Sequence, residues 1–202
     1  MKIEEIANNP ILIIMISLII FLCVLYVYCL IGGRGKYKKI IRYQKQKRNC
    51  KISGNFLKNG GYTLIFNHKQ NEIIVSLNLL NFTSTIFEVT LNNSINQKME
   101  IYKKSYLSNH AKKTANKNII LGNESFDKEF IIKGNDERFI RKILTFEIQY
   151  KILKIFKKYN KAEIELYNNS LIIYIPIVIK TNESFDEIMD LTLKLIDKFS
   201  NY

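Results

Sequence analysis

An uninterrupted apolar run, from Ile11 to Ile31, dominates the hydropathy pattern of the chain. Its 21 residues include no charged side chain. A helix of this length spans about 31 Å, close to the ~30 Å thickness of a bilayer's hydrocarbon core. The pattern predicts a transmembrane helix over residues 11–33, after a polar lead at residues 1–10. The run is too long, and its start too acidic, for a cleaved signal peptide, so we expect an uncleaved anchor.

A basic segment at residues 34–50 follows the apolar run directly. With the next residue included, nine Lys or Arg and no Asp or Glu occur here: Arg34, Lys36, Lys38, Lys39, Arg42, Lys45, Lys47, Arg48 and Lys51. The positive-inside rule then predicts a single-pass protein of the cell membrane, with its N-terminus outside and residues 51–202 in the cytoplasm. The same charges suit anionic lipid headgroups, each contributing about 1 kcal/mol near such a surface. Alternatively, these charges only fix the orientation of the helix in the bilayer. The sequence does not distinguish between lipid binding and this role.

Beyond residue 50 the pattern changes to short runs rich in Ile, Val, Thr and Phe between turn residues, which is typical of β-strands. We expect strands within residues 51–57, 62–67, 72–80, 85–91 and 98–103, and a hairpin turn at Asn59-Gly60-Gly61 between the first two. A second β section is expected over residues 118–133, and a further hairpin from residues 162–167 and 171–179. Because Pro176 has no amide hydrogen, it indicates an edge strand or a bulge.

Three capping signals predict helices in the same region. Asp136 can cap one helix and Thr145 a second, and Ser184 with Glu187 forms a capping box that opens the last. Apolar residues recur at helical spacing in each, and the stripe of the last helix is expected to lie in the core. The order of strands, helix, hairpin and helix favours an α+β fold: one domain at residues 51–202 in which two or three helices pack an antiparallel sheet.

Charge and cysteine content narrow the classes of function. The formal net charge is +13; nine positive charges fall in residues 34–51 and residues 1–10 contribute −1, which leaves +5 in residues 52–202. We therefore expect no nucleic-acid partner, although the lysines between Lys151 and Lys158 keep a nucleic-acid interface as an alternative. Residues 51–202 contain no cysteine, so a disulfide framework is excluded there.

No catalytic, metal-binding or cofactor-binding constellation is evident in the sequence. His68 and His110 are the only histidines, and neither has a partner at metal-ligand spacing. A phosphate loop, a nucleophile elbow and a dinucleotide fingerprint are also missing from the sequence. We therefore expect that the protein is not an enzyme and that it binds no cofactor. The alternative is a membrane-tethered enzyme that uses scattered acids such as Asp127 and Asp136.

One pattern in the second half of the chain has the form Gly-x-x-x-Phe-Asp-x-x-Phe-x-Val-x-Gly-x-Asp, with Ile132 in the place of Val. Its positions are Gly122, Phe126, Asp127, Phe130, Gly134 and Asp136. The pattern resembles that of a set of prokaryotic membrane-tethered domains, the DUF3137 group, and the layout is similar over residues 51–202. The resemblance implies architectural roles and no activity: the two phenylalanines as core anchors, Gly134 as a turn and Asp136 as a cap.

These observations combine into one expected function. We expect a single-pass membrane protein that presents a non-catalytic interaction domain in the cytoplasm. Its partners would be the lipid bilayer and an unidentified protein or membrane surface.

Overall fold

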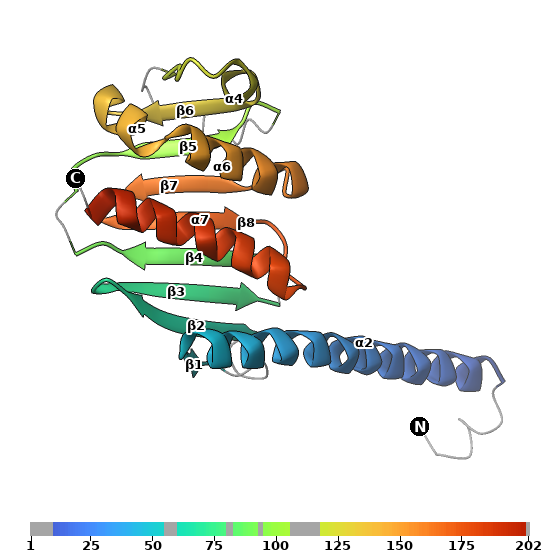
Figure 1. Ribbon diagram of the computed structural model, residues 1–202. Coiled ribbons are helices and arrows are strands. Elements are labelled where there is room, and N and C mark those ends of the chain that lie inside the picture. Colours follow the sequence, from blue (N-terminus) through green and yellow to red (C-terminus); the bar gives the residue numbers. More distant parts are fainter. Residues whose placement is uncertain (1–9, 55–59, 80–82, 93–94, 106–117, 201–202) are drawn as a thin grey trace. The chain divides into compact units, whose positions relative to one another are not determined.

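The computed structural model describes residues 10–54, 60–79, 83–92, 95–105 and 118–200, although some side chains of the first helix are left out. The chain divides into two compact units, Met1–Arg42 and Tyr43–Tyr202. The division falls within the first helix, α2, which runs from Pro10 to Arg48. Figure 1 shows the elements in chain order.

The predicted transmembrane helix over residues 11–33 is wrong. Among the residues that the structure describes, no helix combines the length and hydropathy needed to cross a bilayer. The sequence pattern placed a boundary at Gly32-Gly33, but the helix continues through the basic segment for 39 residues in all. It ends where Asn49 takes a positive φ of 47°. The predictions of a single-pass protein, of a cell-membrane localisation and of an outside N-terminus depended on this span and are corrected with it.

The second unit is built on one eight-stranded sheet in which every described pairing is antiparallel. The strand order is β1-β2-β3-β4-β8-β7-β5-β6. The strands are β1 (Lys51–Ser53), β2 (Gly61–His68), β3 (Asn71–Asn78), β4 (Ser84–Thr90), β5 (Met99–Lys103), β6 (Phe130–Gly134), β7 (Glu163–Tyr167) and β8 (Ser170–Ile175). The first strand is thus shorter than expected, and Asn59 of the expected hairpin turn lies outside the described residues.

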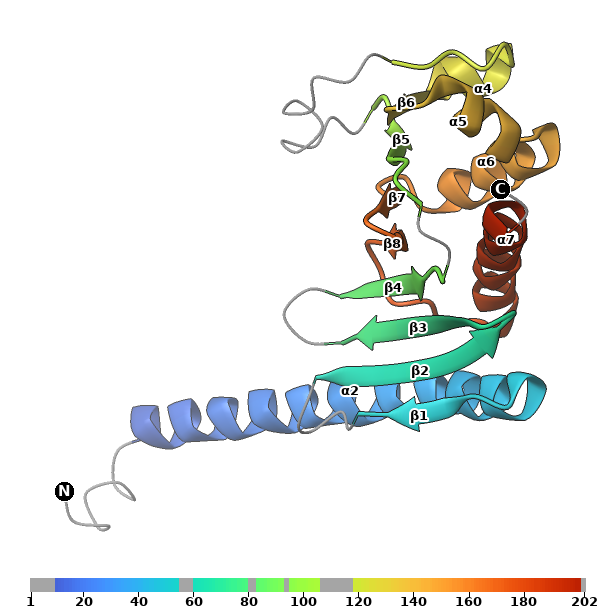
Figure 2. The same ribbon diagram turned by 90° about the vertical axis from the view of Figure 1, so that its left-hand side faces the viewer.

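Four helices accompany the strands: α4 (Glu124–Glu129), α5 (Glu137–Ile143), α6 (Phe146–Lys158) and α7 (Asn182–Ser200). Figure 2 shows α4, α5, α6 and α7 on the same side of the sheet. Since the sheet is antiparallel and its helices cover one face, residues 43–202 form an α+β fold. The sequence had predicted two or three helices, and α4 is the one that it missed.

The core lies between the sheet and these helices. Phe185 of α7 contacts Phe87 of β4 and Phe66 of β2, with ring centroids 5.3 and 6.4 Å apart. At the other end of the sheet Phe130 contacts Phe126 at 4.5 Å and Phe156 of α6 at 5.2 Å. All six rings are at most 5% exposed.

Three local predictions differ from the structure for identifiable reasons. Residues 124–129 are helical rather than extended, because the side chain of Asn123 accepts the amide of Phe126 and caps a helix. The last helix begins at Asn182, and Thr181 rather than a Ser184–Glu187 box receives its early amides: Ser184 N donates to Thr181 Oγ1 at 3.2 Å. Pro176 marks no edge strand, since β8 lies between β4 and β7 and ends one residue earlier.

The buried stripe of α7 leads to a stability prediction. Ile196 is 0% exposed, so Ile196→Ala should lower the free energy of unfolding by about 2–5 kcal/mol. Asp197 is off the stripe and forms partly exposed bonds to His68 and Lys69, so Asp197→Ala should cost at most about 1 kcal/mol. Urea unfolding of the full chain measures both, with exposed Lys198→Ala as the unchanged control. Equal, small losses for Ile196→Ala and Asp197→Ala would contradict a core role for α7.

Candidate functional site

The residues of the Gly122–Asp136 pattern hold one corner of the domain together. Phe126 and Phe130 stack on each other and are buried. The carboxylate of Asp127 accepts the amides of Leu121 and Gly122 at 2.9 and 2.8 Å. Asp136 accepts the amide of Phe139 at 3.0 Å and caps α5, which confirms its predicted capping role.

The two glycines of the pattern are required for different physical reasons. Gly122 has a φ of +89°, which side chains other than glycine rarely adopt. A Cβ on Gly134 would lie 2.2 Å from Cδ1 of Ile140 and 2.5 Å from the carbonyl oxygen of Lys98. Both positions therefore require glycine for the packing of this corner.

The carboxylates considered for an acidic active site are used in these bonds. Asp127 and Asp136 each bind backbone amides, and they do so in different turns. Among the described residues no three His, Cys, Asp or Glu side chains are grouped as a metal would require. Asp127 and Asp136 thus each have a structural role in binding backbone amides.

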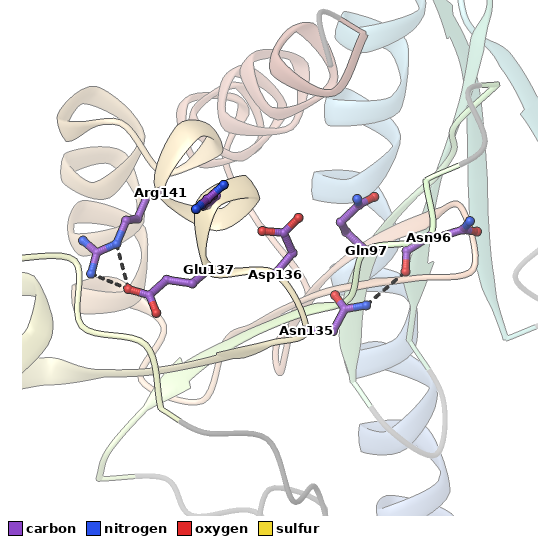
Figure 3. A pocket seen from close by; sticks show the side chains of 7 residues that line it. Asn96, Gln97, Asn135, Asp136, Glu137 and Arg141 are labelled. Atoms are coloured by element: carbon purple, nitrogen blue, oxygen red, sulfur yellow. Dashed lines mark hydrogen bonds and ion pairs between the residues drawn. The ribbon is translucent and has the colours of Figure 1, made fainter.

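An open hollow of about 640 Å³ lies beside the start of α5 (Figure 3). Its lining is polar and of mixed charge: Asn96, Gln97, Asn135, Asp136, Glu137, Arg138 and Arg141. Most of these groups already bind protein. Asn135 donates to the carbonyl of Asn96 at 3.2 Å, and Arg141 donates to Glu137 at 2.7 Å and to the carbonyl of Ile120 at 2.5 Å. The polar lining of the hollow is thus partly engaged in bonds within the protein.

The basic residues at the end of α2 divide into two sets. Lys47 and Arg48 both bind the carboxylate of Asp186 on α7, each at 2.7 Å, and Gln44 adds a third bond at 3.1 Å. Lys38, Lys39, Arg42, Lys45 and Lys51 are exposed, and the side chains of Arg34 and Lys36 lie outside the described set. Two of the nine predicted lipid-binding cations thus hold the chain together. An anionic surface as partner of the exposed ones stays a prediction.

The bonds to Asp186 overcome the effect of its partial burial. Burial raises the pKa of the Asp186 carboxyl, but hydrogen bonds from Lys47, Gln44 and Arg48 together lower it, and the net pKa lies below the ordinary value. The charged form of Asp186 is therefore stabilised by folding.

The lysines of α6 are paired in a similar way with α7. Lys151 binds Asp190 at 2.5 Å, and Lys154 and Lys158 bind the two oxygens of Glu187 at 2.9 and 2.8 Å. Lys194 of α7 pairs with Glu147 of α6 in the opposite direction. The hydrogen bond from Lys158 is the main reason why the pKa of Glu187 is lowered. Three of the four lysines proposed for nucleic-acid binding thus have acidic partners within the domain, which weakens that alternative.

One surface feature of α6 is not among the features predicted from the sequence. Phe146 and Tyr150 are 76% and 68% exposed, although both are aromatic. They lie four residues apart, so they share a side of the helix. The sequence does contain a sign of it. At helical spacing Phe146 and Tyr150 fall outside the apolar stripe formed by Ile148, Ile152 and Ile155, which predicts that both rings are exposed.

Comparisons with known proteins give a similarity in fold. The sequence matches no protein-family model, and no curated protein matches it. Among solved structures, the chain is similar to the crystal structure of the mycobacterial trehalose monomycolate transport factor A, TtfA, with a TM-score of 0.55 and 9% sequence identity. The match covers 82% of this chain and 93% of the other. At this identity the similarity shows the fold alone.

The Asp186 cluster leads to a prediction about pH. Since folding lowers the Asp186 pKa, the stability it contributes is present above the unfolded pKa of about 3.9 and is lost as the pH falls through the lower folded pKa. Asp186→Asn should lower the free energy of unfolding by about 1–2 kcal/mol at pH 7. The difference from wild type should shrink steadily as urea unfolding is repeated toward pH 3.

The matched control for this prediction is Glu183→Gln, an exposed acid in the first turn of the same helix. It should change stability little at any of these pH values. A deficit of Asp186→Asn that stayed constant from pH 7 to pH 3 would show that the charge of Asp186 contributes nothing.

Proposed function

We propose that residues 43–202 form a non-catalytic interaction domain that binds another protein through Phe146 and Tyr150 of α6. The observation that carries the proposal is the exposure of these two aromatic rings on one side of a helix. Aromatic side chains are enriched in the centres of protein–protein interfaces, where they bury a large area at a small entropic cost. Leaving two of them in water is unfavourable unless a partner covers them.

Another exposed apolar residue lies in the segment before α4. Ile120 is 57% exposed, and its carbonyl accepts the bond from Arg141 of α5. The side-chain amide of Asn123, three residues after Ile120, donates to the side chain of Gln149 at 2.6 Å. Gln149 lies between Phe146 and Tyr150 in the sequence of α6. These bonds join the segment that carries Ile120 to α5 and α6. We define the two exposed aromatic residues of α6, Phe146 and Tyr150, as the α6 patch.

The α6 patch stands on a rigid support. The opposite side of α6 is buried through Ile148, Ile152 and Phe156, and its lysines pair with α7. A preorganised surface loses little conformational freedom on binding, which favours affinity.

Two further observations support a binding role over catalysis. Asp127 and Asp136 act as caps, so the acids suggested for a reaction have a structural use. The solved structure with a similar fold belongs to a protein described as a transport factor. Membership of the DUF3137 group, which carries no known activity, is also proposed on the Gly122–Asp136 pattern.

Site-specific photo-crosslinking in native cells tests the α6 patch. A photoreactive residue in place of Tyr150 should give a discrete crosslinked protein, because the partner covers this position. The same residue in place of Lys198, which is exposed on α7, should give none. Adding Phe146→Ser to the Tyr150 probe should abolish the product.

Phe146→Ser should leave the thermal midpoint unchanged within error, because exposed substitutions change stability by no more than about 0.5 kcal/mol. Equal crosslinking from positions 150 and 198, or no product from position 150, would contradict the α6 patch as a binding surface.

A further inference from the structure

Among the described residues, no helix of the second unit covers the other face of the sheet. The four helices lie on the face that carries Phe66, Phe87 and Phe130 (Figure 2). Because side chains alternate along a strand, the residues next to these phenylalanines in each strand point to the opposite face. We call this opposite face of β3, β4, β8, β7 and β5 the open face.

The register aligns the residues of the open face in rows across the strands. One row runs Ile74, Glu88, Ile172, Glu165 and Glu100 over β3, β4, β8, β7 and β5. The neighbouring row runs Ser76, Ile86, Tyr174, Glu163 and Tyr102 over the same strands. Side chains that are directly opposite in such rows contact one another.

The middle of the open face is apolar. Ile74, Ile86, Ile172 and Tyr174 lie there and are all partly exposed. An antiparallel sheet with one uncovered face normally places polar residues on it. Four large apolar side chains on three adjacent strands are therefore unusual for a surface meant to stay in water, and they indicate contact with another molecule.

The charged side chains that the five strands themselves place on the open face are acidic. Its five strands carry five glutamates and no Lys or Arg on this face: Glu72, Glu88, Glu100, Glu163 and Glu165. Three cations adjoin this face. Lys51 and Lys133 lie on the outer strands β1 and β6, and the amine of Lys98, just before β5, lies 4.5 Å from the ring centroid of Tyr167 on β7. A local excess of acid is notable in a chain whose net charge is +13.

We propose that the open face binds a basic amphipathic segment of a partner protein. The apolar side chains of such a segment would cover the isoleucines and Tyr174, and its Lys or Arg side chains would approach the glutamates. Charge complementarity of this kind directs encounter and fixes orientation.

The same charges disfavour two other occupants. A second copy of the chain, stacked by the same face, would place glutamates opposite glutamates, which is destabilising. An anionic membrane would be repelled by this face. The proposal goes beyond the α6 patch, which lies on a helix of the opposite layer, and the two are tested by different variants.

A model peptide tests the proposal on the full chain. The probe is a short fluorescent peptide of leucine and lysine arranged as an amphipathic helix, followed by anisotropy at physiological salt. Wild type should bind it at least about tenfold more tightly than a serine–lysine peptide of equal charge or a leucine–glutamate peptide of equal hydropathy. Glu88→Lys and, separately, Ile172→Ser should each weaken binding by about tenfold or more.

Two controls make the result specific. Glu124→Lys makes the same charge change at an exposed site on α4, off the sheet, and should keep the wild-type affinity within about twofold. Phe146→Ser should also bind the peptide normally, so that failure of the α6 patch is distinguishable. Circular dichroism measures whether each variant is folded. If Ile172→Ser does not fold, Glu88→Lys alone tests the proposal.

Several results would overturn the proposal. Equal binding of the serine–lysine peptide would reduce the effect to net charge, and equal binding of the leucine–glutamate peptide would remove the role of the glutamates. An affinity unchanged by Glu88→Lys would place the peptide elsewhere. A self-association in sedimentation that Glu88→Lys alters would assign the open face to a second copy instead.

Discussion

The burial of the apolar stripe of α7 is the interaction on which the rest of the second unit depends. Phe185, near its start, contacts β2 and β4, and Phe199, near its end, contacts Phe139 of α5 with ring centroids 5.9 Å apart. Between these, Ile188, Leu195 and Ile196 are fully buried. Because one helix joins strands from the first half of the chain to a helix from the second, its burial stabilises contacts that are far apart in sequence.

Polar residues on the exposed side of α7 add the remaining connections. Asp186 binds the end of α2, Glu187 and Asp190 bind α6, and Asp197 binds the turn between β2 and β3. Individually, exposed ion pairs contribute little, but they set the orientation of the elements that they join. Much of the positive charge around α6 and the end of α2 is consequently used within the domain, and charge counted along the sequence overstates what is available to an external anion.

The helix layer and the open face give the domain two different surfaces. The α6 patch is a pair of exposed aromatic side chains on a well-packed helix. The open face is broader, with apolar residues in the middle and glutamates among them. An α+β domain of one sheet and one helix layer necessarily leaves a sheet face uncovered by its own helices, and here the side chains of that face fit a basic partner better than water alone.

The sequence by itself determined the local elements of residues 43–202, because strand alternation, helical spacing and capping act over a few residues. It located both C-terminal hairpin strands, the division between α5 and α6 at Leu144-Thr145, and the cap at Asp136. It failed where a local signal had two readings. The apolar run after Pro10 predicts a membrane span that the described helix does not provide. The apolar residues near Phe126 predict a strand, whereas the cap at Asn123 starts a helix at residues 124–129.

Only the tertiary structure decided which strands are neighbours, which face is covered and which charges are paired. The central place of β8 between β4 and β7 joins residues about 85 positions apart, and no local pattern encodes such a pairing. The same holds for Lys47 and Arg48, whose partner Asp186 is more than 130 residues away. Their roles follow from long-range packing of apolar faces, which brings together side chains whose separation in sequence gives no sign of contact.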